Sequence, residues 1–377
     1  MKIAINCIFC QPRGGGVREY IYNVVSALSQ IDTENEYILY VLKDCVEYAR
    51  QVLPHVDNMR IQPTPYDSSY KSVILRSLFS NRYWLAEEKK EQFDIFHSPF
   101  FHAPRLKRSK VIITVHDLRF CRYPSTYTLP RYLFLRTAVM RSIQQADKII
   151  SISEFTKQEI MDVYKIGCEK IKVVNEAINR EDFSIRQLDG YVLDDVAKPL
   201  EGSRFMLSVG HIEPRKNYGR LLDAFATLKE KTETNDVKLV IVGKKGHHYK
   251  EILRRMGKMS DVYYLDFVSR ELLLWLYQHA ALFVFPSFYE GFGFPPLEAA
   301  CFGIISAVSN ASSIPEVCGE SAAYFNPFSV EDMANTLWRC LSDEAFVNEK
   351  KTLLMPNLDR FSWEKNACET LQTYHSL

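Results

Sequence analysis

The chain has 377 residues, 47% of them hydrophobic and 25% charged, and its formal net charge is +1. A chain of this length is typical of two domains or one large one, with enough apolar residues for complete hydrophobic cores. The small net charge gives no overall field that would attract nucleic acid, and no run of about 18 apolar residues predicts a membrane span. The composition therefore speaks against a nucleic-acid-binding protein and against a membrane-spanning one.

Nine cysteines are scattered along the chain, and Cys7 and Cys10 are the only close pair. A second pair that would complete a zinc site is missing, so we expect reduced structural thiols, as in cytoplasmic proteins. Residues 1–6 read directly as a strand, without the charged region, apolar core and cleavage site of a signal peptide. The sequence therefore predicts a cytoplasmic protein.

The first half of the chain alternates apolar runs with helical patterns. Strands are predicted at residues 2–9, 36–42, 93–97, 111–115, 148–152 and 171–174, and helices at 17–29 and 127–144. Gly14, Gly15 and Gly16 lie between the first strand and the first helix, where a glycine loop lets a phosphate approach the helix start. Three consecutive glycines do not match the spaced glycines of a dinucleotide site, and a flexible turn is the alternative.

His116 follows the strand predicted at residues 111–115. The carboxyl end of a parallel strand is where α/β folds place ligand contacts, so His116 is a candidate site residue. A structural histidine is the alternative.

Residues 71–141 hold 14 Lys and Arg residues against 5 Asp and Glu residues, a local net charge of +9. The helix predicted within residues 127–144 is amphipathic and carries aromatic residues and arginines. Such a segment fits peripheral contact with an anionic membrane, at the inner face of the plasma membrane, or a lipid-diphosphate acceptor. A solvated basic face is the alternative.

Residues 180–203 are polar and aperiodic, which indicates an interdomain linker. A second series follows, with strands predicted at residues 205–209, 237–242, 262–265, 281–285 and 304–308. Arg215 and Lys216 stand just before a helix predicted at 218–229, and two adjacent cations there match a diphosphate. A solvated cationic turn is the alternative. Two strand–helix series predict an α/β protein with two doubly wound, Rossmann-like domains.

The stretch from residue 285 to residue 300 combines glycines, acids and prolines after a buried strand. Gly291 and Gly293 allow a tight turn and close approach to a ligand, and Pro295 opens a helix without losing a hydrogen bond. Glu290 is expected in the loop and Glu298 in the first helical turn, so that both flank one cavity. The alternative is that Glu298 only complements the helix dipole and Glu290 is a solvated loop acid.

An acid, seven residues and a second acid, in the order Glu-Gly-Phe-Gly-Phe-Pro-Pro-Leu-Glu-Ala, resemble the signature of the retaining GT-B glycosyltransferases of family four. The likeness extends over nearly the whole chain and is nearest in character to bacterial polysaccharide mannosyltransferases. It implies a GT-B fold, in which two Rossmann-like domains face each other across a cleft. The expected boundaries are residues 1–185 for the acceptor-side domain, 186–203 for the linker and 204–361 for the nucleotide-sugar domain. A last helix, at about 362–377, is expected to pack back on the first domain.

The resemblance also implies roles for individual residues. His116, Arg215, Lys216 and Glu290 would be catalytic: the histidine steadies the transferred sugar through a hydroxyl, the two cations stabilise the leaving diphosphate, and Glu290 contacts sugar hydroxyls. Glu298 would bind the donor ribose. The remaining expected donor-binding residues are Gly15, Gly16, Gly210, Val268, Gly291, Phe292 and Gly293. Many members carry an arginine directly after the first glycine of the phosphate loop, where this chain has His211, and this departure makes Arg215 more necessary.

These features predict a retaining, metal-independent transferase without a cofactor. It would move a hexose, with mannose favoured, from a nucleotide diphosphate sugar to a glycan acceptor of bacterial surface polysaccharide synthesis, and this acceptor is expected on a lipid diphosphate. GDP-mannose is the first donor expected and a UDP-hexose the second. The sequence has no Asp-x-Asp triplet near a strand end, which is the motif that would indicate a bound metal. The alternatives are a nucleotide-sugar epimerase of the same fold, a nicotinamide dehydrogenase and a non-catalytic glycan-binding protein.

Overall fold

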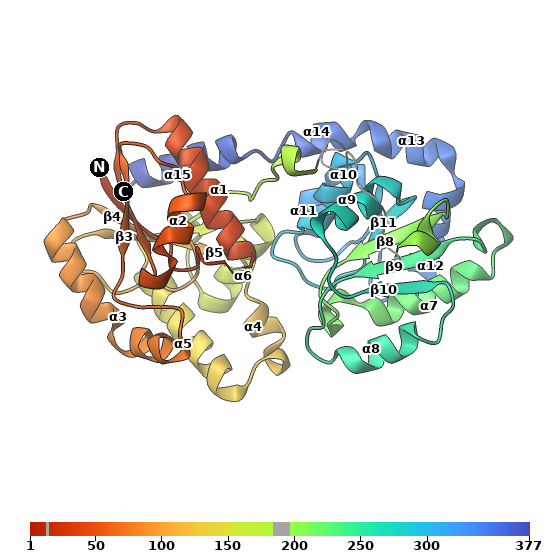
Figure 1. Ribbon diagram of the computed structural model, residues 1–377, viewed down its shortest axis with the longest axis horizontal. Coiled ribbons are helices and arrows are strands. Elements are labelled where there is room, and N and C mark those ends of the chain that lie inside the picture. The colour runs from red at the N-terminus through yellow and green to blue at the C-terminus, as the bar shows by residue number, and fades with distance from the viewer. Residues whose placement is uncertain (13–14, 184–196) are drawn as a thin grey trace. The chain divides into compact units, whose positions relative to one another are not determined.

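The computed structural model describes residues 1–12, 15–183 and 197–377, without the side chains of residues 70–79 and of residue 232 (Figure 1). Most of the predicted linker, residues 186–203, therefore lies outside the described residues. The chain divides into two compact units. Unit 1 comprises Met1–Ala177 and Ser362–Leu377, and unit 2 comprises Ile178–Phe361.

Unit 1 is built on a parallel sheet of seven described strands, in the order β3-β2-β1-β4-β5-β6-β7. The strands are β1 (Lys2–Asn6), β2 (Glu36–Val41), β3 (Met59–Pro63), β4 (Ile95–Ser98), β5 (Lys110–Val115), β6 (Lys148–Ser151) and β7 (Ile171–Val173). The order reverses between β1 and β4, which is the topological switch point of a doubly wound sheet.

Helices cover both faces of this sheet. They are α1 (Gly16–Ile31), α2 (Val46–Val52), α3 (Tyr70–Glu91), α4 (Arg119–Arg122), α5 (Leu129–Gln145), α6 (Glu154–Tyr164) and the last helix of the chain, α15 (Trp363–His375). Neighbouring residues of β1 point to opposite faces: Ile3 packs with residues of α1 and α15, whereas Ala4 packs with Trp84 of α3 and Val139 of α5. Helix α15 lies beside α1, and Tyr374 near its end donates or accepts a hydrogen bond with the buried His97 at 2.7 Å (Figure 1).

Unit 2 repeats the plan with six described strands in the order β10-β9-β8-β11-β12-β13, all parallel. The strands are β8 (Phe205–Val209), β9 (Lys238–Val242), β10 (Val262–Leu265), β11 (Leu282–Phe285), β12 (Ser306–Ser309) and β13 (Ala323–Phe325). Its helices are α7 (Tyr218–Lys229), α8 (Tyr249–Met256), α9 (Arg270–His279), α10 (Phe294–Cys301), α11 (Ile314–Cys318), α12 (Val330–Ser342), α13 (Glu344–Thr352) and α14 (Leu354–Leu358). The switch point here lies between β8 and β11.

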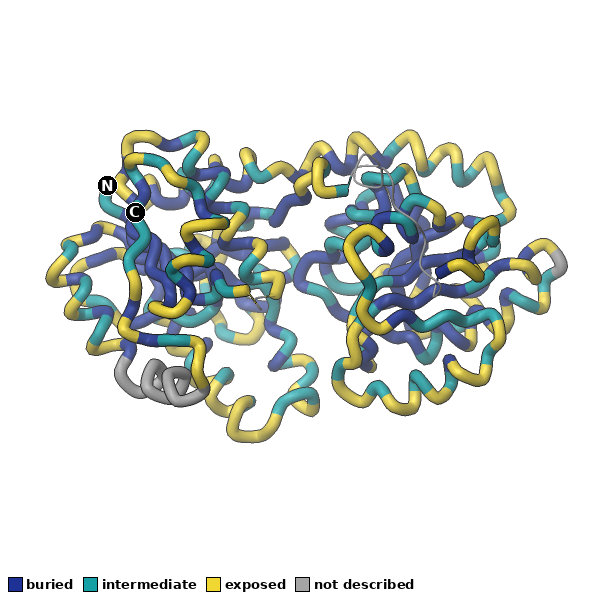
Figure 2. Tube along the Cα trace, in the orientation of Figure 1, coloured by how far each residue is buried: buried dark blue, intermediate teal, exposed yellow. Residues whose placement is uncertain are grey.

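Local sequence signals account for several helix starts. Ser153, Ser269 and Ser362 each accept a hydrogen bond from the backbone N–H three residues later, which satisfies a donor that the helix itself leaves unpaired. Pro295 stands within the first turn of α10, as its sequence position predicted. The inner strands of both units are buried, whereas the edge strands β3, β7 and β10 are largely half-buried or exposed (Figure 2). Among the described residues, no helix is both long enough and apolar enough to cross a membrane.

The prediction of two doubly wound, Rossmann-like domains is confirmed. The sequence patterns did not predict the strands β3 and β13 or the helices α2, α3, α4, α8, α9, α12, α13 and α14. They also predicted that the first strand ends at residue 9, whereas β1 ends at Asn6. The placement of Glu298 in the first turn of its helix is wrong, because α10 begins at Phe294 and Glu298 is its fifth residue. The glycine turn therefore ends earlier than expected, and Glu298 lies one turn into the helix.

Candidate active site

Two loops meet at the switch point of unit 2, where the carboxyl ends of β8 and β11 lie side by side. The loop after β8 begins at Gly210 and carries Arg215 and Lys216 in a short turn, Pro214–Lys216. The loop after β11 carries Glu290. Backbone contacts join the two loops, since the N–H of Phe288 donates to the carbonyl of Arg215 at 2.9 Å. Such a switch point is where doubly wound sheets bind ligands.

Gly210 makes room for the side chain of Lys216. Its backbone has φ +155°, and a Cβ there would lie 2.9 Å from Cε of Lys216. Gly243, after β9, approaches from the other side, and a Cβ on it would lie 2.0 Å from the carbonyl oxygen of Gly210. Only glycine fits at positions 210 and 243. The side chain of Lys216 therefore has room to fold back over the end of β8, where its Nζ lies 4.6 Å from the centre of the Phe285 ring.

The carboxylate of Glu290 bridges both cations. Its Oε1 lies 2.7 Å from Nζ of Lys216, and its Oε2 lies 2.6 Å from Nη1 of Arg215. Arg215 also contacts Oε1 of Glu213 at 2.7 Å and donates to the carbonyl of Tyr289 at 2.5 Å. The side chains of Arg215, Lys216 and Glu290 are only 11%, 9% and 13% exposed. The alternatives of a solvated cationic turn and a solvated loop acid are therefore wrong.

Burial and pairing act on the ionisation of this cluster in opposite directions. Burial raises the pKa of Glu290, but Lys216 and Arg215 outweigh it and bring the pKa down to about 2. Burial lowers the pKa of Lys216 and is only partly offset by Glu290. Burial also acts to lower the pKa of Arg215, but Glu290 and Glu213 outweigh it and raise that pKa. The carboxylate is thus ionised at neutral pH, and two cations are fixed at one point.

Glu298 occupies a different environment. Its Oε2 accepts a hydrogen bond of 2.5 Å from the hydroxyl of Tyr277 in α9, and burial raises its pKa. Lys216 and Arg270 act in the opposite direction on that pKa, which places Glu298 within electrostatic reach of the cation cluster. The carboxylate is held by a side chain and does not cap the helix. The alternative in which Glu298 only complements the helix dipole is therefore wrong.

The glycine turn that follows Glu290 is held by two serines. The hydroxyl of Ser312 accepts a hydrogen bond of 3.0 Å from the N–H of Glu290, and that of Ser313 donates to the carbonyls of Glu290 and Phe292 at 3.0 and 2.7 Å. Gly293 has φ +121°, which few other residues adopt. The ring of Phe292 is buried, so the contact expected between Phe292 and the sugar-nucleotide donor would be made by its backbone.

Val268 is half-buried in the loop between β10 and α9, next to the exposed Phe267. Nζ of Lys244 lies 4.6 Å from the centre of the Phe267 ring. The expected base contact of Val268 stays a prediction.

The remaining predicted site residues belong to unit 1. Gly15 and Gly16 are exposed at the start of α1. His116 is held on both sides: Nδ1 lies 2.7 Å from Oε1 of Glu176 and Nε2 lies 2.9 Å from the carbonyl of Pro99. This is the arrangement of a structural histidine, so the expected sugar contact requires one of these bonds to be exchanged. Burial acts to lower the pKa of His116, but Glu176 outweighs it and raises that pKa.

Comparison with known proteins identifies the family. Residues 194–366 match the family model described as glycosyl transferases group 1, and residues 14–182 match the model described as glycosyltransferase family 4. The chain is a family 4 glycosyltransferase.

Similar sequences carry names of the same kind. The O-antigen chain mannosyltransferase B of Escherichia coli is 28% identical over 299 residues, which are 78% of this chain and 77% of that protein. The serotype-specific mannosyltransferase WbdA of Escherichia coli is 32% identical over 236 residues, which are 60% of this chain but 28% of that longer protein.

Solved structures of low identity share the fold. A sucrose-phosphate synthase of Thermosynechococcus elongatus has a TM-score of 0.74 and 18% identity, with 100% of this chain and 98% of that one covered. HepE of Anabaena, solved in complex with UDP and glucose, has a TM-score of 0.72 and 16% identity, with both chains fully covered. The predicted GT-B fold class of the glycosyltransferase is thus confirmed.

Unit 2 therefore brings together Gly210, Arg215, Lys216 and Glu290, with Glu298 nearby. The sequence reading missed Glu213, Tyr277, Ser312 and Ser313, which hold these groups in place. The pair Ser312-Ser313 stands in the sequence directly before the helix α11, a position that is also typical of a helix start. Among the described residues, no group of three or more His, Cys, Asp or Glu side chains is arranged to hold a metal ion.

Proposed function

We propose that this glycosyltransferase is a retaining, metal-independent enzyme of bacterial surface polysaccharide synthesis. It moves a mannosyl group from a nucleotide diphosphate sugar, with GDP-mannose tested first and a UDP-hexose second, to a hydroxyl of a glycan acceptor carried on a lipid diphosphate. The names of its relatives support the sugar and the pathway. The observation that carries the proposal is the buried cluster in which Glu290 bridges Arg215 and Lys216.

The chemistry follows from two fixed cations at one point of the sheet edge. The bond between the donor sugar C1 and its phosphate oxygen breaks, and the diphosphate leaves with an additional negative charge. Arg215 and Lys216 stabilise that charge as preorganised donors, and a buried charge needs no reorganisation at the moment of reaction. The acceptor oxygen bonds to C1 on the same face, and its proton passes to the departing phosphate oxygen. The nucleoside diphosphate and the extended glycan are the products.

Glu290 and Glu298 bind different parts of the donor in this proposal. Glu290 takes sugar hydroxyls with the carboxylate that also orients Lys216, and the turn of Gly291, Phe292 and Gly293 lies under the sugar. Glu298, held by Tyr277, takes the ribose hydroxyls. Lys216 has three N–H donors and Glu290 accepts one of them, so the ammonium group has donors left for a diphosphate oxygen.

Unit 1 supplies the acceptor side in this proposal, with Gly15 and Gly16 at the donor phosphates and His116 at the transferred sugar. Its helix α5 provides the contact with the inner face of the plasma membrane. Leu129 and Leu133 are 68% and 49% exposed, and arginines follow them on a helix that has no acid in its sequence. An apolar stripe flanked by cations fits an anionic lipid surface.

A thermal-shift panel of nucleoside diphosphates tests the donor class. A ligand present at 100 times its dissociation constant stabilises the protein by about 2.7 kcal/mol, which raises the melting temperature measurably. We expect GDP to stabilise the wild type in EDTA and to lose this effect in Lys216→Ala. Stabilisation by UDP alone would move the donor to a UDP-hexose, and no stabilisation by any nucleotide would contradict the proposal. Incubation of the protein with donor but without acceptor tests the epimerase alternative, because an epimerase would convert the donor into an isomeric sugar nucleotide and a transferase would not.

A further inference from the structure

The switch point of unit 1, between β1 and β4, also holds a cavity. Its apolar part has a volume of about 270 Å³ and is lined by residues that follow the carboxyl ends of β1 and β4, among them Phe9 and Phe100. Leu135 of α5 and Trp84 of α3 close it from other sides. The rings of Phe9 and Phe100 meet edge to face with centres 4.6 Å apart, so the wall is a packed aromatic surface. We refer to this cavity as the aromatic pocket.

Two polar atoms at the aromatic pocket are buried without a partner. Oδ1 of Asn6, at the end of β1, and Oγ1 of Thr64, directly after β3, have no hydrogen-bond partner in the described part of the chain. Both residues are only 2% exposed. Buried polar groups of folded proteins are almost always paired with protein, water or ligand, so these atoms indicate a ligand with hydroxyl groups. A pure hydrocarbon chain would leave both atoms unpaired.

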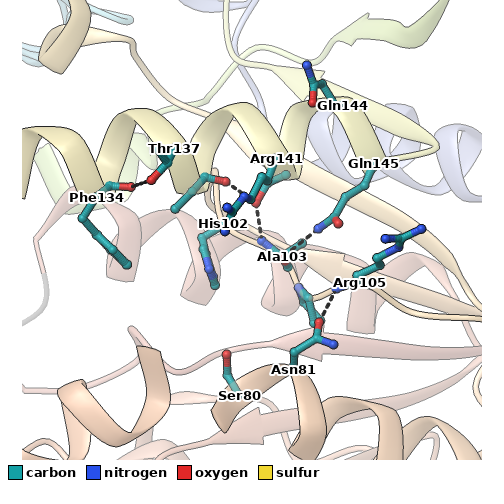
Figure 3. Close-up of a pocket in the computed structure, with 13 residues that line it drawn as sticks. Ser80, Asn81, His102, Ala103, Arg105, Phe134, Thr137, Arg141, Gln144 and Gln145 are labelled. Carbon is teal, nitrogen blue, oxygen red and sulfur yellow. Dashed lines mark hydrogen bonds between the residues drawn. The ribbon is translucent and has the colours of Figure 1, made fainter. Parts of the chain in front are cut away.

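A second cavity, of about 690 Å³, adjoins the aromatic pocket and shares Ser80, His102, Phe134 and Ala138 with it. Figure 3 shows α5 on one side of this second cavity, with Thr137 and Arg141, and α3 with Asn81 on another. Arg105 lies at its wall as well, on the segment between β4 and β5. We refer to this cavity as the arginine pocket.

The lining of the two pockets is cationic. Arg131 lines the aromatic pocket, Arg105 and Arg141 line the arginine pocket, and none of the residues described as lining either pocket is an acid. None of these three arginines forms an ion pair with a described residue. All three arginines are exposed. Guanidinium groups without a carboxylate partner at an open pocket fit a phosphate group, which they bind through two parallel hydrogen bonds.

We propose that the two pockets together bind a glycosyl phosphate: the sugar ring lies in the aromatic pocket, and the phosphate lies among the arginines of the arginine pocket. A pyranose ring has apolar C–H faces for the aromatic wall and hydroxyl groups for Asn6 and Thr64. The inference rests on the proposed function, in which the acceptor is a glycan on a lipid diphosphate; the ligand of the two pockets is the sugar of this acceptor that is joined to the diphosphate. It names a substrate class, a sugar esterified to phosphate, and distinguishes it from a neutral glycan.

Isothermal titration of the full chain with mannose 1-phosphate and N-acetylglucosamine 1-phosphate tests the proposal. The methyl glycosides of the same sugars and inorganic phosphate serve as half-ligands, and a sugar linked through diphosphate to a short polyprenyl chain in detergent serves as the lipid-linked form. We expect at least one sugar phosphate to bind about ten times more tightly than its methyl glycoside and than inorganic phosphate. Tighter binding of the polyprenyl-linked form would identify the lipid-linked source, and equal binding the soluble one.

Three variants locate the site. Arg141→Gln should weaken sugar-phosphate binding about ten- to hundredfold, because it removes a charged hydrogen bond. Thr64→Val should weaken it about three- to tenfold while the melting temperature of the free protein stays or rises, because the variant removes a buried unpaired hydroxyl. Arg136→Gln, on the same helix but outside both linings, is the matched control and should bind as the wild type does.

Several outcomes would overturn the assignment. They are sugar-phosphate binding that is unchanged in both Arg141→Gln and Thr64→Val, binding of the methyl glycoside as tight as that of the phosphate ester, and no binding of any sugar phosphate to a protein that binds GDP or UDP. The last result would leave the donor proposal for unit 2 standing. Failure of both nucleotides to bind would instead contradict the proposed function itself.

Discussion

Replacing Glu290 by glutamine tests whether the bridge between Arg215 and Lys216 is electrostatic. The pKa of this carboxyl falls from an ordinary value of 4.5 to about 2. A difference of about 2.5 pKa units corresponds to about 3 kcal/mol of stability, and the side chain is buried well enough that solvent screening takes little of it. Breaking a buried ion pair by removing one partner costs about 3–5 kcal/mol, which agrees.

The sign of the pH dependence follows from the direction of the shift. Because the pKa is lower in the folded state, the stabilisation is complete above about pH 4.5 and is lost as the pH falls towards about 2. Glu290→Gln should therefore be about 3 kcal/mol less stable than the wild type at pH 7, and this difference should shrink below pH 4.5. For a domain of the size of unit 2, the expected loss in melting temperature is about 6–12 °C.

Scanning calorimetry between pH 3 and pH 7 measures this difference. Glu271→Gln, an exposed acid on α9, is the matched control and should change the melting temperature little. A Glu290→Gln protein within about 1 kcal/mol of the wild type at pH 7, or a difference that does not change with pH, would refute the electrostatic bridge.

Three further predictions address neighbouring groups. Lys216→Ala should lower turnover about 10²–10³-fold in a steady-state transfer assay, because one preorganised donor to the leaving group is lost, and near-normal turnover would remove the lysine from the mechanism. Glu176→Gln should lower the pKa of His116 in an NMR titration, because the Glu176 carboxylate raises that pKa, and an unchanged titration would contradict the pairing. The charged histidine stabilises the fold below its unfolded pKa, and this contribution disappears as the pH rises through the folded pKa. Gly243→Ala should destabilise unit 2 by about 2 kcal/mol or more in chemical denaturation, because the new Cβ would lie 2.0 Å from a backbone oxygen. Gly257→Ala is the control and should cost little, since its Cβ would lie 3.5 Å from the nearest atom. Equal effects of the two substitutions would show that the close approach at Gly243 does not require glycine.

The sequence predicted the strands and turns that position the site, since apolar runs followed by glycine or proline define them locally. β8 and α7 were predicted with the residue boundaries that the structure shows. The region of β3 and α3 was missed because it has no clear periodicity, and its helix mixes apolar and basic residues around its circumference. Tertiary packing, which a local pattern does not contain, decides its structure.

Residue types at the site were predictable, but their partners were not. Glu290 is 74 residues from Lys216 in sequence, and only the pairing of β8 with β11 brings it to Lys216 and the neighbouring Arg215. For the same reason, the sequence did not reveal that Tyr277 holds Glu298 or that Ser312 and Ser313 hold the glycine turn. The catalytic and donor-binding roles expected for all the predicted site residues, in unit 1 and in unit 2, stay predictions.

The anomeric configuration of the product, measured by NMR in excess EDTA, tests the central claim most directly. The wild type should transfer mannose from GDP-mannose with retention of configuration, at a rate that EDTA leaves unchanged, because Arg215 and Lys216 supply the positive charge at the leaving diphosphate. Inversion at C1, or transfer that stops in EDTA and returns with a divalent cation, would contradict the account.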